Sequence, residues 1–139
     1  MGFREKMAWV MVLSLLVFAA IYFVPMSYTL QAVGFLAPAS AAVGTLAVIG
    51  LVVIATIGAI IAALSNVRDA ESPLDEREAS IVARSTSFGS VVLGVGTVGI
   101  VLAAHLTDSL GWMVPSLVGA LTVSQVVTYG AQITMYRSG

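Results

Sequence analysis

His105 and Asp108 are the residues whose types and spacing most directly suggest chemistry. Side chains three positions apart share one face of a helix, so this imidazole and carboxylate could exchange a proton or provide two metal ligands. A single histidine is too few for a convincing metal site, and the chain has no cysteine to supply thiolates. We therefore expect the pair to lie at the membrane interface on the non-cytoplasmic side, where Asp108 caps a turn. We expect no metal and no cofactor.

A stripe of polar side chains follows one face of the last apolar segment. Its members recur every three or four residues, which matches the helical repeat. An unpaired amide in hydrocarbon costs several kcal/mol, so the stripe must face protein, water or lipid headgroups. Hydrogen bonding between helices is commoner than a pore, so the pattern favours helix packing over the lining of a polar path. The stripe consists of Thr122, Gln125, Tyr129, Gln132 and Tyr136.

The segment SPLDEREASIVARS, residues 72–85, concentrates charge in the middle of an apolar chain. Ser72 followed by Pro73 predicts a helix that begins at Pro73, and no breaker separates it from the next apolar segment. The charged side chains form either a contact surface for a partner protein or a solvated segment that maintains the orientation of the chain. The candidate contact residues are Asp75, Glu76, Arg77, Glu78 and Arg84.

Composition assigns the elements that carry these residues to a membrane. Of the 139 residues, 59% are hydrophobic and 9% are charged, whereas a soluble domain carries about 25% charged residues. Four apolar segments approach the length of about 20 residues that crosses a bilayer. The sequence therefore predicts an all-α, integral membrane four-helix bundle, with residues 1–139 forming one domain.

The four predicted spans cover residues 7–24, 39–64, 85–105 and 112–136. Pro25 is expected to end the first span, because proline disfavours helical geometry in the residue before it. The uncharged segment 25–38 is expected to form a loop at the membrane interface. Residues 66–84 form the polar connection, which includes the charged helix.

The distribution of lysine and arginine predicts the orientation. All six of these residues lie on one side of the predicted spans: Arg4, Lys6, Arg68, Arg77, Arg84 and Arg137. The positive-inside rule then places both termini and the 66–84 connection in the cytoplasm.

Three motifs give the chain a resemblance to a known group of proteins. FREKMAW near the start, SPLDERE in the middle and SQVVTYGAQITMYRSG at the end resemble an uncharacterised family of small bacterial four-helix membrane proteins. That resemblance implies four spans, a cytoplasmic PLDER-type motif and a last helix rich in glutamine and tyrosine. This chain has Thr128 where many members have an acidic residue. The matching positions are Pro73, Leu74, Asp75, Glu76, Arg77, Ile81, Gln125, Tyr129, Gln132, Tyr136 and Arg137.

Small residues four positions apart predict close contacts between helices, either within one chain or between copies. Examples are Gly58 with Ala62, and Ser90 with Gly94. No HExxH, GxSxG or phosphate-loop motif is present, so no catalytic residues are predicted, and no basic patch is large enough to bind nucleic acid.

The function that these features favour is association without enzymatic activity. We expect a multi-pass protein of the bacterial cytoplasmic membrane that acts as a structural or regulatory partner through its PLDERE segment. Its partners are then the lipid bilayer and either further copies of the chain or another membrane protein. The alternative is a small oligomeric channel or transporter that uses the polar stripe. Against it stands the absence of charged residues from the middle of every span, because such residues mark most ion-coupled transport.

Overall fold

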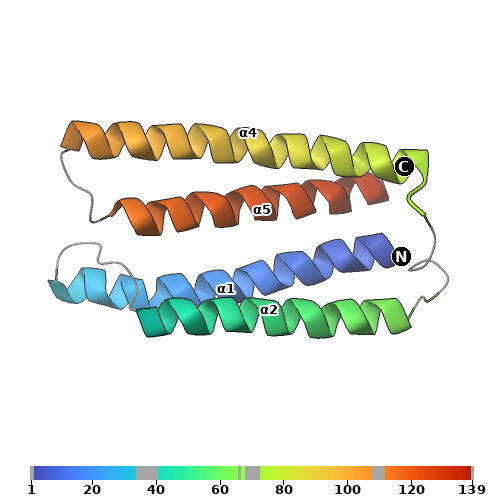
Figure 1. Cartoon of the computed structure of the whole chain (residues 1–139), viewed down its shortest axis with the longest axis horizontal. Coiled ribbons are helices and arrows are strands. Elements are labelled where there is room, and N and C mark those ends of the chain that lie inside the picture. The colour runs from blue at the N-terminus through green and yellow to red at the C-terminus, as the bar shows by residue number, and fades with distance from the viewer. Residues whose placement is uncertain (1, 34–40, 66, 68–72, 108–111, 139) are drawn as a thin grey trace.

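The computed structural model describes residues 2–33, 41–65, 67, 73–107 and 112–138. These residues form four long helices: α1 (Phe3–Val33), α2 (Ala41–Leu64), α4 (Glu76–Thr107) and α5 (Met113–Arg137). All four are long and apolar enough to cross a membrane. The described residues thus confirm an all-α fold of four membrane-spanning helices, and both chain ends lie at the same end of the helices (Figure 1).

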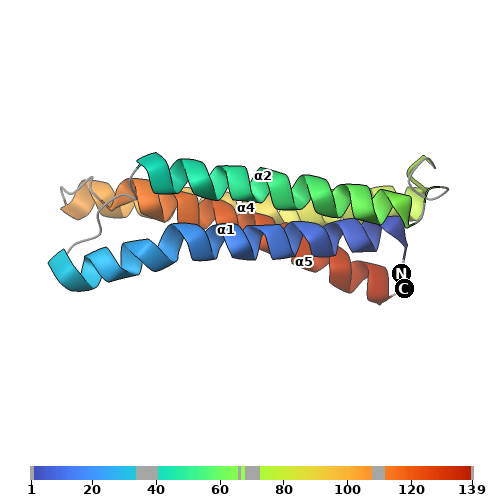
Figure 2. The ribbon, with the colours of Figure 1, turned by 90° about the horizontal axis from the view of Figure 1, so that it is seen from below.

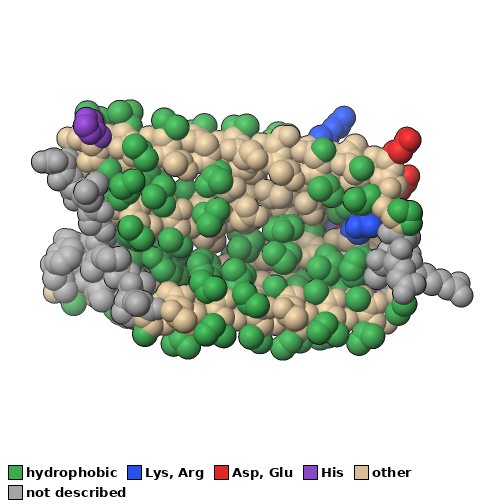
Figure 3. All heavy atoms as spheres, viewed as in Figure 1, with side chains coloured by type: hydrophobic (Ala, Val, Ile, Leu, Met, Phe, Trp, Pro, Cys, Tyr) green, Lys and Arg blue, Asp and Glu red, His purple; other side chains and the backbone are tan. Residues whose placement is uncertain are grey.

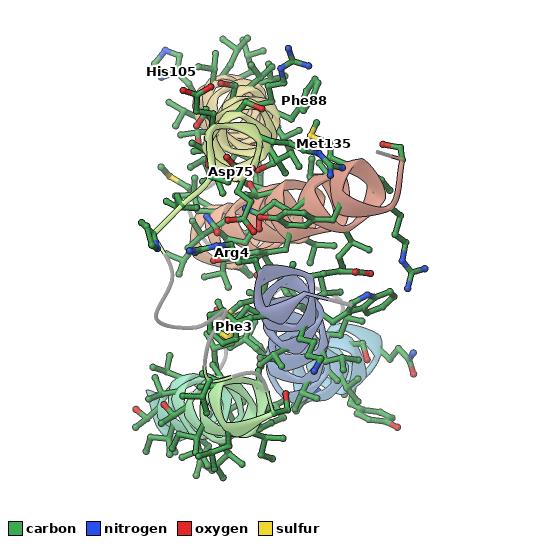
Figure 4. The ribbon with its side chains drawn as sticks, turned by 90° about the vertical axis from the view of Figure 1, so that its right-hand side faces the viewer. Phe3, Arg4, Asp75, Phe88, His105 and Met135 are labelled. Carbon is green, nitrogen blue, oxygen red and sulfur yellow. The ribbon has the colours of Figure 1, made fainter. Side chains whose placement is uncertain are left out.

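The helices stand side by side in the order α2, α1, α5, α4. Backbones approach one another between α1 and α2, between α1 and α5, and between α4 and α5, and no other helix pair in the described ranges does so. The view along the helices shows this row end-on (Figure 4), and Figure 2 shows that α5 is inclined relative to α1. Because α2 and α4 each have one backbone neighbour, most of their surface faces outward.

α1 continues through Pro25, so the prediction that the first span ends at Val24 is wrong. Proline removes one backbone donor, but membrane helices tolerate it where neighbouring helices and hydroxyl side chains compensate. The side chains of Tyr22 and Met26 are buried on either side of the proline, and Ser27 donates its hydroxyl proton to the carbonyl of Val24 at 2.7 Å. Residues 25–33 of the predicted loop are therefore helical, and its remainder lies outside the described residues.

α4 is one continuous helix, as predicted, but it begins at Glu76 rather than at Pro73. The carboxylate of Asp75 accepts the backbone N–H of Glu76 at 2.7 Å, and the carboxylate of Glu78 accepts the backbone N–H of Asp75 at 3.4 Å. Glu78 thus reaches back to the residue before the helix, as the third helical residue of a capping box does, and both carboxylates place negative charge at the positive end of the helix dipole. The predicted cap, Ser72, lies outside the described residues.

The α4 and α5 helices approach each other closely at Gly89. The hydroxyl of Ser124 donates to the carbonyl of Gly89 at 2.8 Å, which is a hydrogen bond from one helix to the other. A Cβ atom at Gly89 would overlap the hydroxyl of Thr128 and lie 3.0 Å from the carbonyl oxygen of Ser124. Two turns further along, a Cβ at Gly96 would lie 3.2 Å from Cβ of Ala120. Glycine is therefore required at position 89 by the proximity of α5.

The α1 and α2 helices also meet at small residues. A Cβ atom at Gly58 would overlap the side chain of Val10, and Ala47 and Ala62 on the same helix are buried. The Gly58 and Ala62 repeat thus lies at a contact within the chain. By contrast, a Cβ at Gly94 would meet nothing within 4 Å, so this glycine is not used in packing α4 against a described helix.

The outer surface of the row is apolar over most of its length (Figure 3). Large side chains such as Val52 on α2 and Val95 on α4 are 57% and 71% exposed. A water-soluble protein rarely leaves such extensive apolar surface uncovered, whereas lipid chains cover it at no cost. Exposure along these helices is therefore exposure to a bilayer.

Replacing Gly89 should destabilise the pairing of α4 with α5. We expect Gly89→Ala to lower the free energy of unfolding by about 1–3 kcal/mol, because the added methyl group must displace Thr128 or the α5 backbone. Denaturation in mixed detergent micelles, followed by far-ultraviolet circular dichroism, measures this change. The matched control is Gly99→Ala on the same helix, which should be neutral or slightly stabilising, because a Cβ there would meet nothing within 4 Å. Equal effects at the two positions would contradict the role assigned to Gly89.

Candidate functional site

Charged side chains gather at one end of the helix row, which we call the charged end (Figures 3 and 4). There the guanidinium of Arg4 on α1 donates to the carboxylate of Glu78 on α4 at 2.9 Å. The backbones of α1 and α4 are not neighbours in the row, so this ion pair reaches across the position of α5. Both side chains are partly exposed, at 26% and 32%.

The first turns of α1 also contact the other two helices at the charged end. The carboxylate of Glu5 accepts a hydrogen bond from the guanidinium of Arg137 on α5 at 3.0 Å. The same guanidinium lies over the ring of Trp9, 5.5 Å from its centroid, a distance at which a cation and an indole attract. Lys6 donates from its ammonium group to the hydroxyl of Ser65, just after α2, at 2.9 Å. The start of α1 is thus tied to α2, α4 and α5.

A cavity of about 700 Å³ opens at the charged end. Asp75, Arg77 and Glu78 line it, whereas Glu76 and Arg84 do not. The structure therefore brings together three of the five predicted contact residues. Sequence reasoning missed the part played by the start of α1, because nothing local in the sequence indicates that it adjoins the PLDER segment. The other lining residues are Gly2, Phe3, Pro73, Leu74, Ile81 and Tyr136.

The charged groups around this cavity differ in whether they have a partner within the chain. Glu78 forms an ion pair with Arg4, and Asp75 caps α4. Arg77 is exposed and forms no ion pair with any residue that the structure describes. Its guanidinium is therefore the cation at the cavity that is available to an external anionic group.

The predicted polar stripe on α5 is divided among three environments. Thr122 is buried and donates to the carbonyl of Val118 in its own helix at 2.8 Å, while Tyr136 lines the cavity at the charged end. Gln125, Tyr129 and Gln132 remain together and line a groove of about 270 Å³ between α4 and α5. We call this feature the α4–α5 groove.

The α4–α5 groove also contains residues that the sequence did not single out. Thr86 and Gly89 line it from α4, and Ser124 lines it from α5. The pair Ser124 and Thr128, four residues apart, carried a detectable signal, because such spacing marks helix contacts. Within the described ranges, the side chains of Gln125, Tyr129 and Gln132 form no hydrogen bond.

The predicted pair at the outer interface is not observed as a pair. His105 is exposed at the end opposite the charged end (Figure 3), and Asp108 lies outside the described residues. The described part of the chain holds no group of three His, Cys, Asp or Glu side chains that could bind a metal ion.

No family model matches this chain, and no curated protein or solved structure shows significant similarity to it. Its function must be inferred from the geometry of the cavity and the groove.

The Arg4 and Glu78 ion pair should contribute measurably to stability. We expect a double-mutant cycle with Arg4→Gln and Glu78→Gln to give a coupling free energy of about 1 kcal/mol, because both partners are partly withdrawn from solvent. Unfolding of the four proteins in detergent micelles gives this value, which should fall in high salt. The Glu5 and Arg137 pair is the control; its coupling should be smaller, because Arg137 is 58% exposed. A coupling within error for Arg4 and Glu78 would show that their contact has no energetic role.

Proposed function

We propose that this multi-pass membrane protein acts by association, binding a segment of a partner protein in the cavity at its charged end. The observation that carries the proposal is the convergence of the PLDER segment, the start of α1 and Tyr136 around one cavity of about 700 Å³. These elements are distant in sequence and are held together by the ion pair between Arg4 and Glu78. The cavity is thus positioned by the fold as a whole.

The chemistry of the cavity suits a protein segment. Phe3, Leu74 and Ile81 give it apolar surface, and Arg77 supplies an exposed guanidinium beside them. Protein interfaces commonly combine an apolar centre with arginine, which binds carboxylates through two hydrogen bonds. The expected partner segment therefore carries an apolar side chain next to an acidic one.

The proposal is of binding and not of catalysis, because the acidic groups at the cavity already have structural partners. Asp75 holds the first turn of α4, and Glu78 holds Arg4.

The cavity is proposed to face the cytoplasm of a bacterial cell. The positive-inside rule supports this side, because the described lysine and arginine residues all lie in the parts of their helices nearest the charged end. The resemblance of the PLDER segment to the bacterial membrane family supports the cytoplasmic membrane as the location.

Site-specific photocrosslinking in living cells tests this proposal. A photoreactive amino acid at Leu74 should give a discrete adduct with a partner protein, because this side chain is 51% exposed and lines the cavity. The same group at Leu106, near the opposite end and 76% exposed, should not give that adduct.

A pair of charge reversals makes the crosslinking test specific. Arg77→Glu should reduce the Leu74 adduct about ten-fold or more, because it repels an acidic partner at the cavity. Arg84→Glu is the matched control, since Arg84 is exposed on the same helix but does not line the cavity. An adduct that survives Arg77→Glu, or that forms equally at Leu106, would refute partner binding in this cavity.

A small oligomeric channel is the second candidate, and the observation that favours it is the α4–α5 groove. The groove opens to the side of a single chain, so a path across the membrane would have to form between copies. Liposomes that contain the purified protein provide the test. We expect no flux of ions or small neutral solutes above protein-free liposomes; flux that Gln125→Leu abolishes would establish the channel instead.

A further inference from the structure

We infer that the α4–α5 groove is the surface through which two copies of this chain associate in the membrane. The inference concerns a different surface from the charged end and does not depend on partner binding there. It rests on the depth of Gln125 in the membrane, on the absence of hydrogen-bond partners for the amides of Gln125 and Gln132 among the described residues, and on the shape of the adjacent face of α4.

Gln125 is the central residue of the 25-residue helix α5. At a rise of about 1.5 Å per residue, it lies about 18 Å from either end of the helix, near the middle of the hydrocarbon. Gln132 is about 7 Å from Arg137, the last residue of the helix, and is within or just below the interface on the charged side. At this depth the amide of Gln125 cannot reach the headgroups, whereas that of Gln132 is close to them.

The amide of Gln125 has unmet hydrogen-bonding capacity at this depth. Its side chain is partly exposed in the groove, and none of the described residues donates a hydrogen bond to it or accepts one from it. Two neighbouring hydroxyls on α5 do have partners, because Ser124 donates to the carbonyl of Gly89 and Thr128 donates to the carbonyl of Ser124 at 3.0 Å. Lipid chains cannot hydrogen-bond, so an amide left facing them is unfavourable and a protein partner is favoured.

The face of α4 beside the groove is shaped for the approach of another helix. Thr86, Ser90 and Gly94 recur every fourth residue and are exposed. A Cβ at Gly94 would meet nothing within 4 Å, so this stripe is not filled by the chain itself. Small residues at this spacing permit close contact between membrane helices.

A second copy is the occupant that matches these features. A glutamine amide carries both a donor and an acceptor, so two copies of Gln125 related by a two-fold axis can bond to each other reciprocally. The small residues of α4 beside them lower the steric barrier to that approach. The same patch then serves both subunits, as a symmetric dimer requires.

Cysteine crosslinking tests this interface directly, because the natural chain has no cysteine. The protein carrying Ser90→Cys, purified and reconstituted in phosphatidylcholine and phosphatidylglycerol vesicles, should form a disulfide-linked dimer on oxidation. Two controls should not: Val95→Cys, which points about 140° away on the same helix, and Val52→Cys, near the middle of α2 and 57% exposed. Similar crosslinking at all three positions would indicate random collision and overturn the proposal.

Energy transfer between labelled copies in the same vesicles tests the role of the amides. Gln125→Leu together with Gln132→Leu should weaken the dimer about ten-fold or more, because membrane hydrogen bonds each change association several-fold. Gln125→Asn, which keeps an amide, should weaken it less than Gln125→Leu. Circular dichroism confirms that the variants remain helical. A wild-type protein that shows no energy transfer beyond random proximity would overturn the proposal.

Two further results separate the dimer from the other possibilities. Modification of Gln125→Cys by a membrane-impermeant thiol reagent would show that water fills the groove, and it would overturn the dimer interface in favour of a polar path. Arg77→Glu should leave the Ser90→Cys crosslink unchanged, since it acts only at the charged end. Failure of either proposal can therefore be recognised while the other stands.

Discussion

The structure depends on one constraint, which is that polar groups in hydrocarbon must find hydrogen-bond partners within protein. Helices satisfy the backbone, and several hydroxyl side chains inside the spans donate to carbonyls of their own helix, as Ser14 does to Val10 at 2.7 Å. The hydroxyl of Ser124 instead donates to the carbonyl of Gly89 on the neighbouring helix. Charged side chains instead gather toward one end of the row, where headgroups and water are close. The amide of Gln125 fits none of these arrangements, and for that reason the α4–α5 groove suggests association.

The row of four helices explains where function can reside. A closed bundle would enclose an interior for a cofactor or a path, whereas among the described residues of this chain only α1 and α5 have backbone neighbours on two sides. Contacts between helices are made by small residues, including Gly58 against Val10 and Gly89 against Thr128. The large apolar side chains are left on the outside, where lipid covers them. Features that could recognise a partner are consequently found at the ends and on the faces of the row.

α4 takes part in both proposed surfaces. Its first turn contributes Asp75, as the cap, and Glu78 to the cavity at the charged end, and its middle contributes Thr86 and Ser90 to the groove. The carboxylate of Asp75 accepts the N–H of Glu76, and the carboxylate of Glu78 accepts the N–H of Asp75, so both stabilise the start of this helix; Glu78 also binds Arg4. A carboxylate that caps one helix and pairs with another couples the local structure of the PLDER segment to the position of α1.

The sequence by itself determined the membrane class, the four spans, the continuity of the charged segment with α4 and the gathering of charge at one end. These properties follow from local hydropathy and from the spacing of charges along the chain. It misplaced two boundaries, because proline's local preference was outweighed by packing around Tyr22 and Met26, and because the carboxylates of Asp75 and Glu78 cap the start of α4 at Glu76. Only the tertiary structure decided which helices are neighbours, and with that the pairing of Arg4 with Glu78 and the division of the polar stripe on α5. The physical reason is that lipid-facing and protein-facing apolar residues have the same hydropathy, so the order of helices depends on shape and hydrogen bonding between segments far apart in the chain.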